Sequence, residues 1–168
     1  MGNGLQSHRY SAFCARRQVK TEDLITPGKK LLFSAPTLIL DNGLDQAHHF
    51  GEPACMPSGF GTDRWLGAIN GPVWNINATY YGHVDCLDAA FISMGKIMCP
   101  SNATTDKLLY HAELANATGT FLDALFEHRP DDFALLQDAN RWGIATTVRW
   151  DLGGLTPDQV VPGLHTTY

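Results

Sequence analysis

The residues best suited to chemistry lie between positions 75 and 85, where amide and phenol side chains precede a histidine and an aspartate. His83 and Asp85 are two residues apart, so in an extended chain both side chains point to the same side. A carboxylate beside an imidazole orients the ring and raises its basicity, which suits general acid–base catalysis. We therefore predict that His83 is the catalytic acid or base and that Asp85 orients it.

Alternation through residues 73–81 predicts a strand with one apolar face and one hydrogen-bonding face. If the phase continues through Gly82, the polar face also carries His83 and Asp85. The side chains on that face that we predict to bind substrate are Asn75, Asn77 and Tyr81. The alternative interpretation is that this polar face is exposed to solvent and binds nothing.

A second group of polar residues is His48-His49 with Glu52 three positions later. Neighbouring strand residues point to opposite faces, so the two histidines do not easily bind one metal ion. A mixed His/carboxylate metal site is the alternative, but we predict no metal and assign His49 to substrate binding. The sequence has no Gly-x-Gly-x-x-Gly, no P-loop, no Gly-x-Ser-x-Gly and no His-Glu-x-x-His, so we expect chemistry without a cofactor.

Length and composition indicate a single globular domain preceded by a basic arm. The chain has 168 residues, of which 44% are hydrophobic and 17% charged. Residues 1–30 carry six basic and two acidic side chains, whereas residues 31–168 carry six basic and fifteen acidic ones. The acidic body argues against nucleic acid as a partner, and no apolar run is long enough to span a membrane.

The four cysteines have no C-x-x-C pair and no regular spacing, so we predict that they are reduced and bind no zinc; they are Cys14, Cys55, Cys86 and Cys99. Three Asn-Ala-Thr tripeptides begin at Asn77, Asn102 and Asn116 and would matter only in a secreted protein. We predict a cytoplasmic protein, although the basic N-terminus leaves import into an organelle open.

Two hairpins are predicted in the first half of the domain. Residues 31–40 form a strand that Pro36 confines to an edge or breaks, and Asp41-Asn42-Gly43 turns it into a return strand at 44–50. Asn70-Gly71 is a favoured type I′ pair between strands at 64–69 and 73–81. Residues 89–98 form a further antiparallel strand, with a short helix as the alternative.

The second half is predicted to be mainly helical. A threonine at position 104 or 105 caps a long helix through His128, and Pro130 stops it. An aspartate at 131 or 132 caps a shorter helix ending at Trp142. Residues 144–152 form a strand, and a last helical turn begins near Pro157. We therefore predict an α+β fold, with an antiparallel sheet of about five strands and one long and one shorter helix packed on one face.

Part of the chain loosely resembles the C-terminal strand–strand–helix portion of wax ester synthases and condensation-type acyltransferases. The resemblance covers about a third of the chain and rests on Gly71-Pro72, Trp74-Asn75-Ile76, Tyr81-Gly82, Pro100 and the helix that follows. Those enzymes carry an HHxxxDG motif, whereas His48-His49 is followed here by Phe-Gly-Glu-Pro-Ala. The resemblance implies a truncated piece of an acyltransferase.

The favoured functional hypothesis is a small cofactor-independent enzyme that binds a largely apolar small molecule and transfers a proton, as an isomerase, cyclase, dehydratase or other lyase does in biosynthesis. Aromatic side chains are numerous enough to line part of such a pocket. The alternatives are a non-catalytic ligand-binding or subunit-interaction domain and the truncated acyltransferase. A homo-oligomer is left open.

Overall fold

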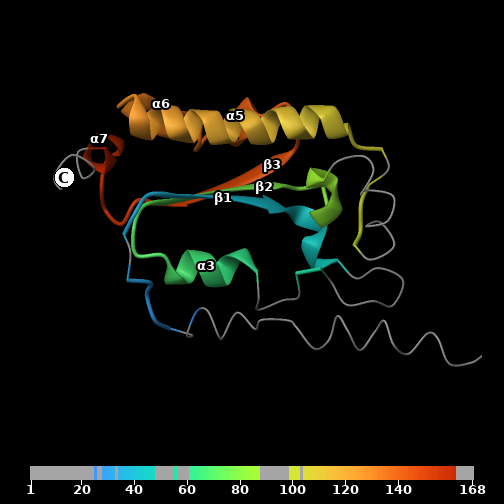
Figure 1. Cartoon of the computed structure of the whole chain (residues 1–168), viewed down its shortest axis with the longest axis horizontal. Helices are drawn as coiled ribbons and strands as arrows, with labels where there is room; N and C mark the ends of the chain where they lie inside the picture. Colours follow the sequence, from blue (N-terminus) through green and yellow to red (C-terminus); the bar gives the residue numbers. More distant parts are fainter. Residues whose placement is uncertain are drawn as a thin grey trace, which may run out of the picture.

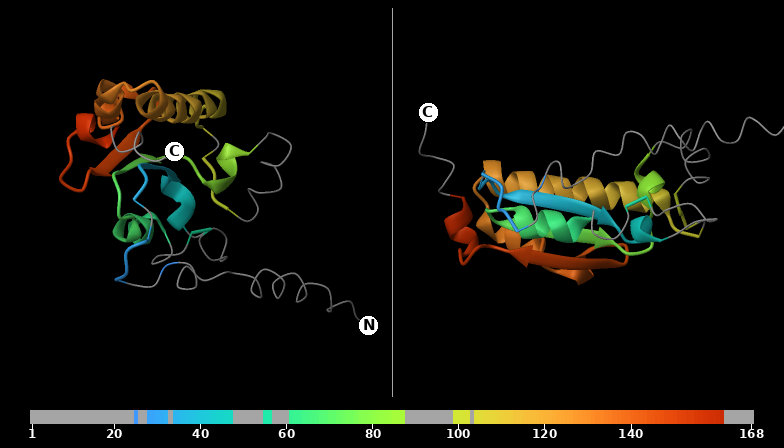
Figure 2. Two further views of the ribbon diagram at one scale, coloured as in Figure 1. Left: turned by 60° about the vertical axis from the view of Figure 1, so that its left-hand side comes forward. Right: turned by 90° about the horizontal axis from the view of Figure 1, so that it is seen from below.

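The computed structural model describes residues 25, 28–32, 34–47, 55–56, 61–87, 99–102 and 104–161. Within these residues the chain forms a mixed α+β fold with three strands and four α-helices. Figure 1 shows three layers, with the sheet between two helical layers. Helices α5 (Lys107–Phe126) and α6 (Pro130–Leu135) cover one face of the sheet, and α3 (Thr62–Ala68) lies on the other, as the turned views in Figure 2 also show.

The sheet is mixed, in contrast to the antiparallel sheet of about five strands that we predicted. Its order is β1 (Thr37–Asn42), β2 (Val73–Ala78) and β3 (Thr146–Asp151). Strands β1 and β2 are parallel, whereas β2 and β3 are antiparallel. Parallel neighbours need a crossover, and α3 lies in the connection between β1 and β2. The strand predicted at 89–98 lies outside the described residues.

The predicted hairpin around Asn70-Gly71 is wrong, because residues 62–68 form α3 rather than a strand. Thr62, Trp65 and Ile69 line one groove at spacings of three and four residues, which is a helical period. A glycine is required at position 71 because the backbone of Ser34 lies very close to it, and not because a type I′ turn forms there. A Cβ at this position would overlap the carbonyl oxygen of Ser34.

The first predicted hairpin is also wrong. Strand β1 begins directly after Pro36, as the break at that proline implied, but it continues through Asn42. A 3-10 helix η1 (Gly43–Gln46) follows in place of a return strand. The rest of the predicted return strand, from residue 48 onward, lies outside the described residues.

The predictions for the second half are largely confirmed. The long helix begins after Asp106, whose carboxylate accepts a hydrogen bond from the Leu109 N–H and takes the capping role that we gave to a threonine. The shorter helix α6 begins after Arg129, so Asp131 and Asp132 lie in its first turn and do not cap it as predicted. It ends at Leu135 rather than Trp142, and a separate 3-10 turn η3 (Ala139–Arg141) follows. Strand β3 lies within the predicted range, and α7 (Pro157–Val160) is the predicted last turn.

The main core lies between the sheet and the layer of α5 and α6. Trp74 of β2 is fully buried and stacks on Phe133 of α6, with 4.5 Å between ring centroids and 11° between planes. Phe121 of α5 meets the Trp74 ring edge-on. These contacts place the apolar face of β2 toward α5 and α6, so the opposite face of the strand, with Asn75 and Asn77, is turned toward α3.

Most of the predicted basic arm, residues 1–30, lies outside the described residues, so its boundary stays a prediction. At its end the Lys30 ammonium donates to the carbonyl of Ile69, and the Leu31 N–H donates to the carbonyl of Ala68. In the described part of the chain, every helix is too short or too polar to cross a membrane.

Candidate functional site

Two short 3-10 turns meet at one edge of the sheet, because the parallel strands β1 and β2 both end there. Turn η1 follows β1, and turn η2 (His83–Cys86) follows β2. The Leu44 N–H donates to the carbonyl of Tyr81 at 3.0 Å and holds the two turns together. The chains approach so closely that a Cβ on Gly43 would overlap the carbonyl oxygen of Thr79.

The first polar group at this edge is a pair formed by His83 and Asp45. The imidazole Nδ1 of His83 lies 3.4 Å from Oδ2 of Asp45. The His83 side chain is 57% exposed, whereas that of Asp45 is 3% exposed. The other carboxylate oxygen of Asp45 is buried and has no hydrogen-bond partner among the described residues. A buried carboxylate therefore faces a solvent-accessible imidazole.

The hydrogen bond to Asp45 raises the pKa of His83 above its usual value, against a smaller opposing effect of burial. The contact at Nδ1 favours the tautomer that carries its proton on that nitrogen, which leaves the Nε2 lone pair free to accept a proton. Asp45 thus provides the orientation that the sequence prediction assigned to Asp85.

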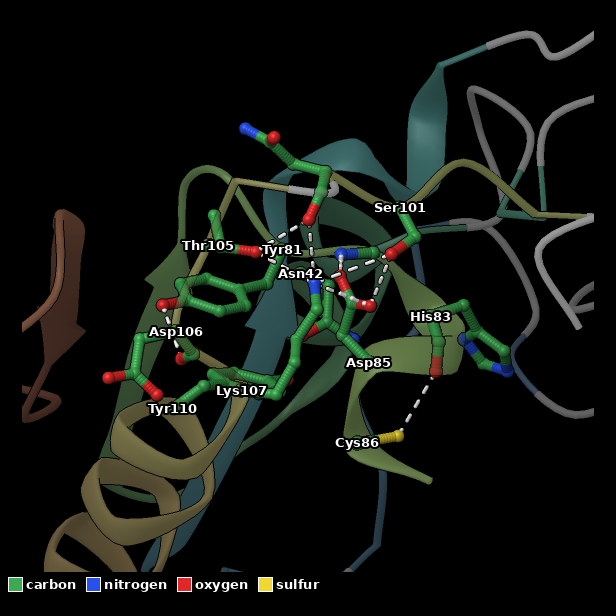
Figure 3. A network of polar contacts seen from close by, with 12 residues as sticks. Asn42, Tyr81, His83, Asp85, Cys86, Ser101, Thr105, Asp106, Lys107 and Tyr110 are labelled. Carbon is green, nitrogen blue, oxygen red and sulfur yellow. Dashed lines mark hydrogen bonds and ion pairs between the residues drawn. The ribbon is translucent and has the colours of Figure 1, made fainter. Parts of the chain in front are cut away.

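Asp85 is fully buried and forms a different polar cluster (Figure 3). One carboxylate oxygen accepts the Gly82 N–H at 2.8 Å. The other accepts the Ser101 hydroxyl and lies 2.7 Å from the ammonium of Lys107. Figure 3 shows Lys107 reaching this cluster from the start of α5, while the ring of His83 is turned away from it. The carboxylate of Asp85 therefore binds Gly82, Ser101 and Lys107, which hold this part of the chain together. Its predicted pairing with His83 is wrong.

The cluster around Asp85 also ties down the segment that precedes α5. Lys107 donates to the carbonyl of Asn102 at 2.9 Å and to the hydroxyl of Thr105 at 2.7 Å. His111 Nε2 lies 2.8 Å from the carbonyl oxygen of Asp85 and so acts as a donor there. These contacts join η2 to the first two turns of α5.

The predicted substrate-binding residues do not share one face. Asn75 is fully buried on the α3 side, where its Nδ2 donates to the carbonyl of Ile39 and its Oδ1 accepts the Arg149 guanidinium at 3.0 and 3.2 Å. Asn77 lies on the same side by alternation, and its Oδ1 is buried without a partner in the described structure. Both asparagines therefore lie on the α3 face of the sheet, and in the described structure no hydrogen bond joins either of them to His83.

Tyr81 lies on the opposite side of the sheet, where its ring stacks on Tyr110 of α5 with centroids 4.2 Å apart. Its hydroxyl donates to the carbonyl of Asp106 at 3.0 Å, and burial raises its pKa. We expected the alternation of the strand to continue from Asn77 to Tyr81 and His83. It does not, because β2 ends at Ala78 and the chain turns there. His49 lies outside the described residues.

A groove of about 390 Å³ lies between β1 and α3, on the face of the sheet opposite to α5 and α6. Its walls are mainly apolar and are formed by Thr37, Leu38, Ile39, Leu40, Asp41, Met56, Thr62, Trp65 and Ile69. Asp41 supplies a buried carboxylate at this groove, which accepts the hydroxyl of Thr62 at 2.5 Å. Met56, which lines the groove, donates its N–H to the carbonyl of Asp45 at 2.8 Å, so the groove and the turn that carries Asp45 are joined by one backbone hydrogen bond.

The cysteines differ from the prediction of reduced thiols. Cys55 and Cys99 form a disulfide with their Cα atoms 5.7 Å apart. Cys86 is a free thiol that donates to the carbonyl of His83, and burial raises its pKa. A thiol that stays protonated near neutral pH is a poor nucleophile, so Cys86 is not suited to covalent catalysis. Within the described residues, no three His, Cys, Asp or Glu side chains converge as a metal site.

Sequence reasoning missed Asp45, Lys107 and the groove. Asp45 lies 38 residues before His83, and no local spacing connects the two. Lys107 carried a signal that could have been used, since a basic residue in the first turn of a helix is unfavourable unless a carboxylate compensates it.

Comparisons with protein-family models, curated proteins and solved structures find no match to this chain. The resemblance to condensation-type acyltransferases therefore gains no support from them.

Proposed function

We propose that the protein is a small acid–base enzyme in which His83 transfers a proton and Asp45 orients it, with an apolar small molecule bound in the groove between β1 and α3. The observation that carries this proposal is the contact of an accessible imidazole with a buried carboxylate, 3.4 Å apart. Such a pair gives a general base that its carboxylate orients, and the hydrogen bond from that carboxylate raises the pKa of the imidazole and so strengthens it as a base.

The groove supports the apolar character of the substrate. Most of its wall is aliphatic or aromatic, with one polar pair formed by Asp41 and Thr62 that could orient a single polar group. Trp65 lines the groove and is 37% exposed. In this arrangement the apolar part of the substrate occupies the groove, and its reacting carbon lies at the end nearest Asp45.

The proposed step needs no cofactor. Nε2 of His83 accepts a proton from a carbon or heteroatom of the substrate while Nδ1–H stays bonded to Asp45. The electron pair released forms a double bond or expels a leaving group within the same molecule, and the proton returns to another atom or to solvent. Isomerisation, cyclisation and elimination all fit this balance.

The test uses nitrobenzisoxazole, an apolar aromatic whose ring opens when a base removes its C–H proton and the N–O bond breaks. The phenolate product is followed by its absorbance. We expect turnover by the wild type and a loss of about 100-fold or more in His83→Ala, the usual contribution of a general base. His128→Asn is the matched control, since His128 lies beyond the end of α5 with φ of 55°, a conformation that Asn tolerates.

The pH profile separates His83 from any other base. The rate should rise with pH and level off above a pKa higher than 6.5, and Asp45→Asn should move that midpoint toward lower pH. Equal rates in His83→Ala and the wild type would disprove the assignment.

A non-catalytic ligand-binding domain is the second candidate, and the groove is the observation that favours it. A fluorescent dye with a large apolar part, such as anilinonaphthalene sulfonate, should then bind to the wild type and bind more weakly to Trp65→Ala. Nitrobenzisoxazole should not be turned over. Dye binding with no turnover selects the binding domain, and turnover that depends on His83 selects the enzyme.

A further inference from the structure

The disulfide between Cys55 and Cys99 concerns the compartment in which the chain folds. Its Cα–Cα distance of 5.7 Å is within the usual range for a disulfide. Structural disulfides form and persist in oxidising compartments and are rare where thioredoxin and glutathione keep thiols reduced. The bond therefore favours an export route over the cytoplasm that the sequence alone suggested.

The three Asn-Ala-Thr tripeptides have different surroundings in the fold. Asn116 is exposed on α5, and Asn102 is partly exposed in the segment just before α5. Asn77 lies in the central strand of the sheet with its Oδ1 buried. The same acceptor motif thus occurs at two accessible positions and at one position inside the sheet.

We propose that the chain matures in an oxidising secretory compartment and carries N-linked glycans on Asn102 and Asn116 but not on Asn77. The reaction joins Nδ2 of the asparagine to the anomeric carbon of an oligosaccharide donated by a polyisoprenyl diphosphate. The bond between that carbon and the diphosphate breaks, the diphosphate leaves with the bonding electrons, and the amide nitrogen gives up one proton.

Local contacts are compatible with a glycan at Asn102. Its Oδ1 accepts both the N–H of Thr104 at 3.0 Å and the hydroxyl of Thr104 at 2.8 Å. Both bonds involve the carbonyl side of the amide, so neither uses the nitrogen that would carry the sugar. Cys99 lies three residues earlier, so the disulfide and the proposed glycan occupy the same short segment.

Asn116 is similarly placed for modification. Its Nδ2 makes one long contact of 3.3 Å, with Glu113 on the same exposed helix surface, which costs little to lose. Helix α5, which carries Asn116, lies on the opposite side of the sheet from α3, so a glycan on Asn116 leaves the groove between β1 and α3 uncovered (Figure 1). The modification is independent of the proposed function.

Asn77 is different because β2 pairs with β1 on one side and β3 on the other. A glycan on this strand would have to pass between the sheet and the layer of α3. Chains modified at Asn77 would fail to form the sheet, so folded and secreted protein should have this residue free.

The experiment expresses the full chain behind a cleavable secretion signal in a eukaryotic host and analyses the secreted protein. Peptide N-glycosidase releases the glycan and converts each modified asparagine to aspartate, which peptide mass spectrometry then locates. We expect modification at Asn102 and Asn116, none at Asn77, and a disulfide-linked peptide pair containing Cys55 and Cys99. Thr104→Ala and Thr118→Ala should each remove one glycan, whereas Thr104→Ser and Thr118→Ser should keep it.

Several results would overturn the proposal. They are secreted protein without sugar at either proposed position, sugar on Asn77 in folded protein, or free thiols at Cys55 and Cys99. The proposal would also be overturned if the host fails to secrete the chain while the same chain, expressed without the signal in the cytosol, is folded and fully reduced.

Discussion

Replacing Asp85 by asparagine should destabilise the fold without removing the proposed catalytic base. The carboxylate is completely buried and interacts with the Gly82 N–H, the Ser101 hydroxyl and the Lys107 ammonium. An amide keeps the shape but loses the charge, and its NH₂ group would face one of these donors. Lys107, only 21% exposed, would be left without its carboxylate.

Breaking a buried ion pair on one side costs about 3 to 5 kcal/mol, because the remaining charge stays desolvated. For a chain of this length each kcal/mol lowers the melting temperature by about 2 to 4 °C. Asp85→Asn should therefore melt roughly 6 to 20 °C below the wild type, as measured by circular dichroism and by urea unfolding. Lys107→Met should lose a similar amount, and the double variant should lose less than the sum of the two.

The matched control is Asp123→Asn, because Asp123 lies on the same helix as Lys107 and forms an exposed ion pair with Arg129 beyond the end of that helix. It should change the free energy of unfolding by less than about 1 kcal/mol. If Asp85→Asn is as stable as this control but has lost turnover of nitrobenzisoxazole, the reasoning fails. Asp85 would then be the catalytic partner of His83 that the local spacing suggested, and the pairing with Asp45 would be incidental.

Two further predictions concern the disulfide and the dependence of stability on pH. Cys55 and Cys99 are separated by 44 residues, so in the chain-entropy model their bond contributes about 4 kcal/mol to the free energy of unfolding. A Cys55→Ser/Cys99→Ser variant should be less stable than the wild type by about this much in urea unfolding. If the two unfolding curves coincide, the bond adds no stability. Because the hydrogen bond to Asp45 raises the pKa of His83, its contribution should be complete below about pH 6.5 and lost as pH rises through the folded-state pKa. Since His83 is more than half exposed, this contribution should be below about 1 kcal/mol. It should be absent in Asp45→Asn, so the free energy of unfolding should depend on pH differently in the two proteins. The same pH dependence in the wild type and in Asp45→Asn would rule the contribution out.

The elements that were predicted correctly depend on local signals. The long helix after position 104, the strand around Trp74, the strand before Asp151 and the last turn at Pro157 all follow from capping residues, proline positions and side-chain periodicity. Such signals involve residues within a few positions of one another. At residues 64–69 the Asn70-Gly71 turn signal predicts a strand, whereas the spacing of Thr62, Trp65 and Ile69 matches the helix that forms there.

The sequence by itself determined most of the helices and strands, the apolar face of β2 and the presence of acid–base side chains near position 83. Tertiary structure alone decided that β1 and β2 run parallel, that His83 faces Asp45 rather than Asp85, and that Cys55 is bonded to Cys99. The reason is that a periodic pattern specifies which face of an element is buried, but not which distant element covers it. Contacts between residues about 40 positions apart depend on chain crossings and on the packing of the whole domain, and the cost of closing such loops varies only slowly with their length.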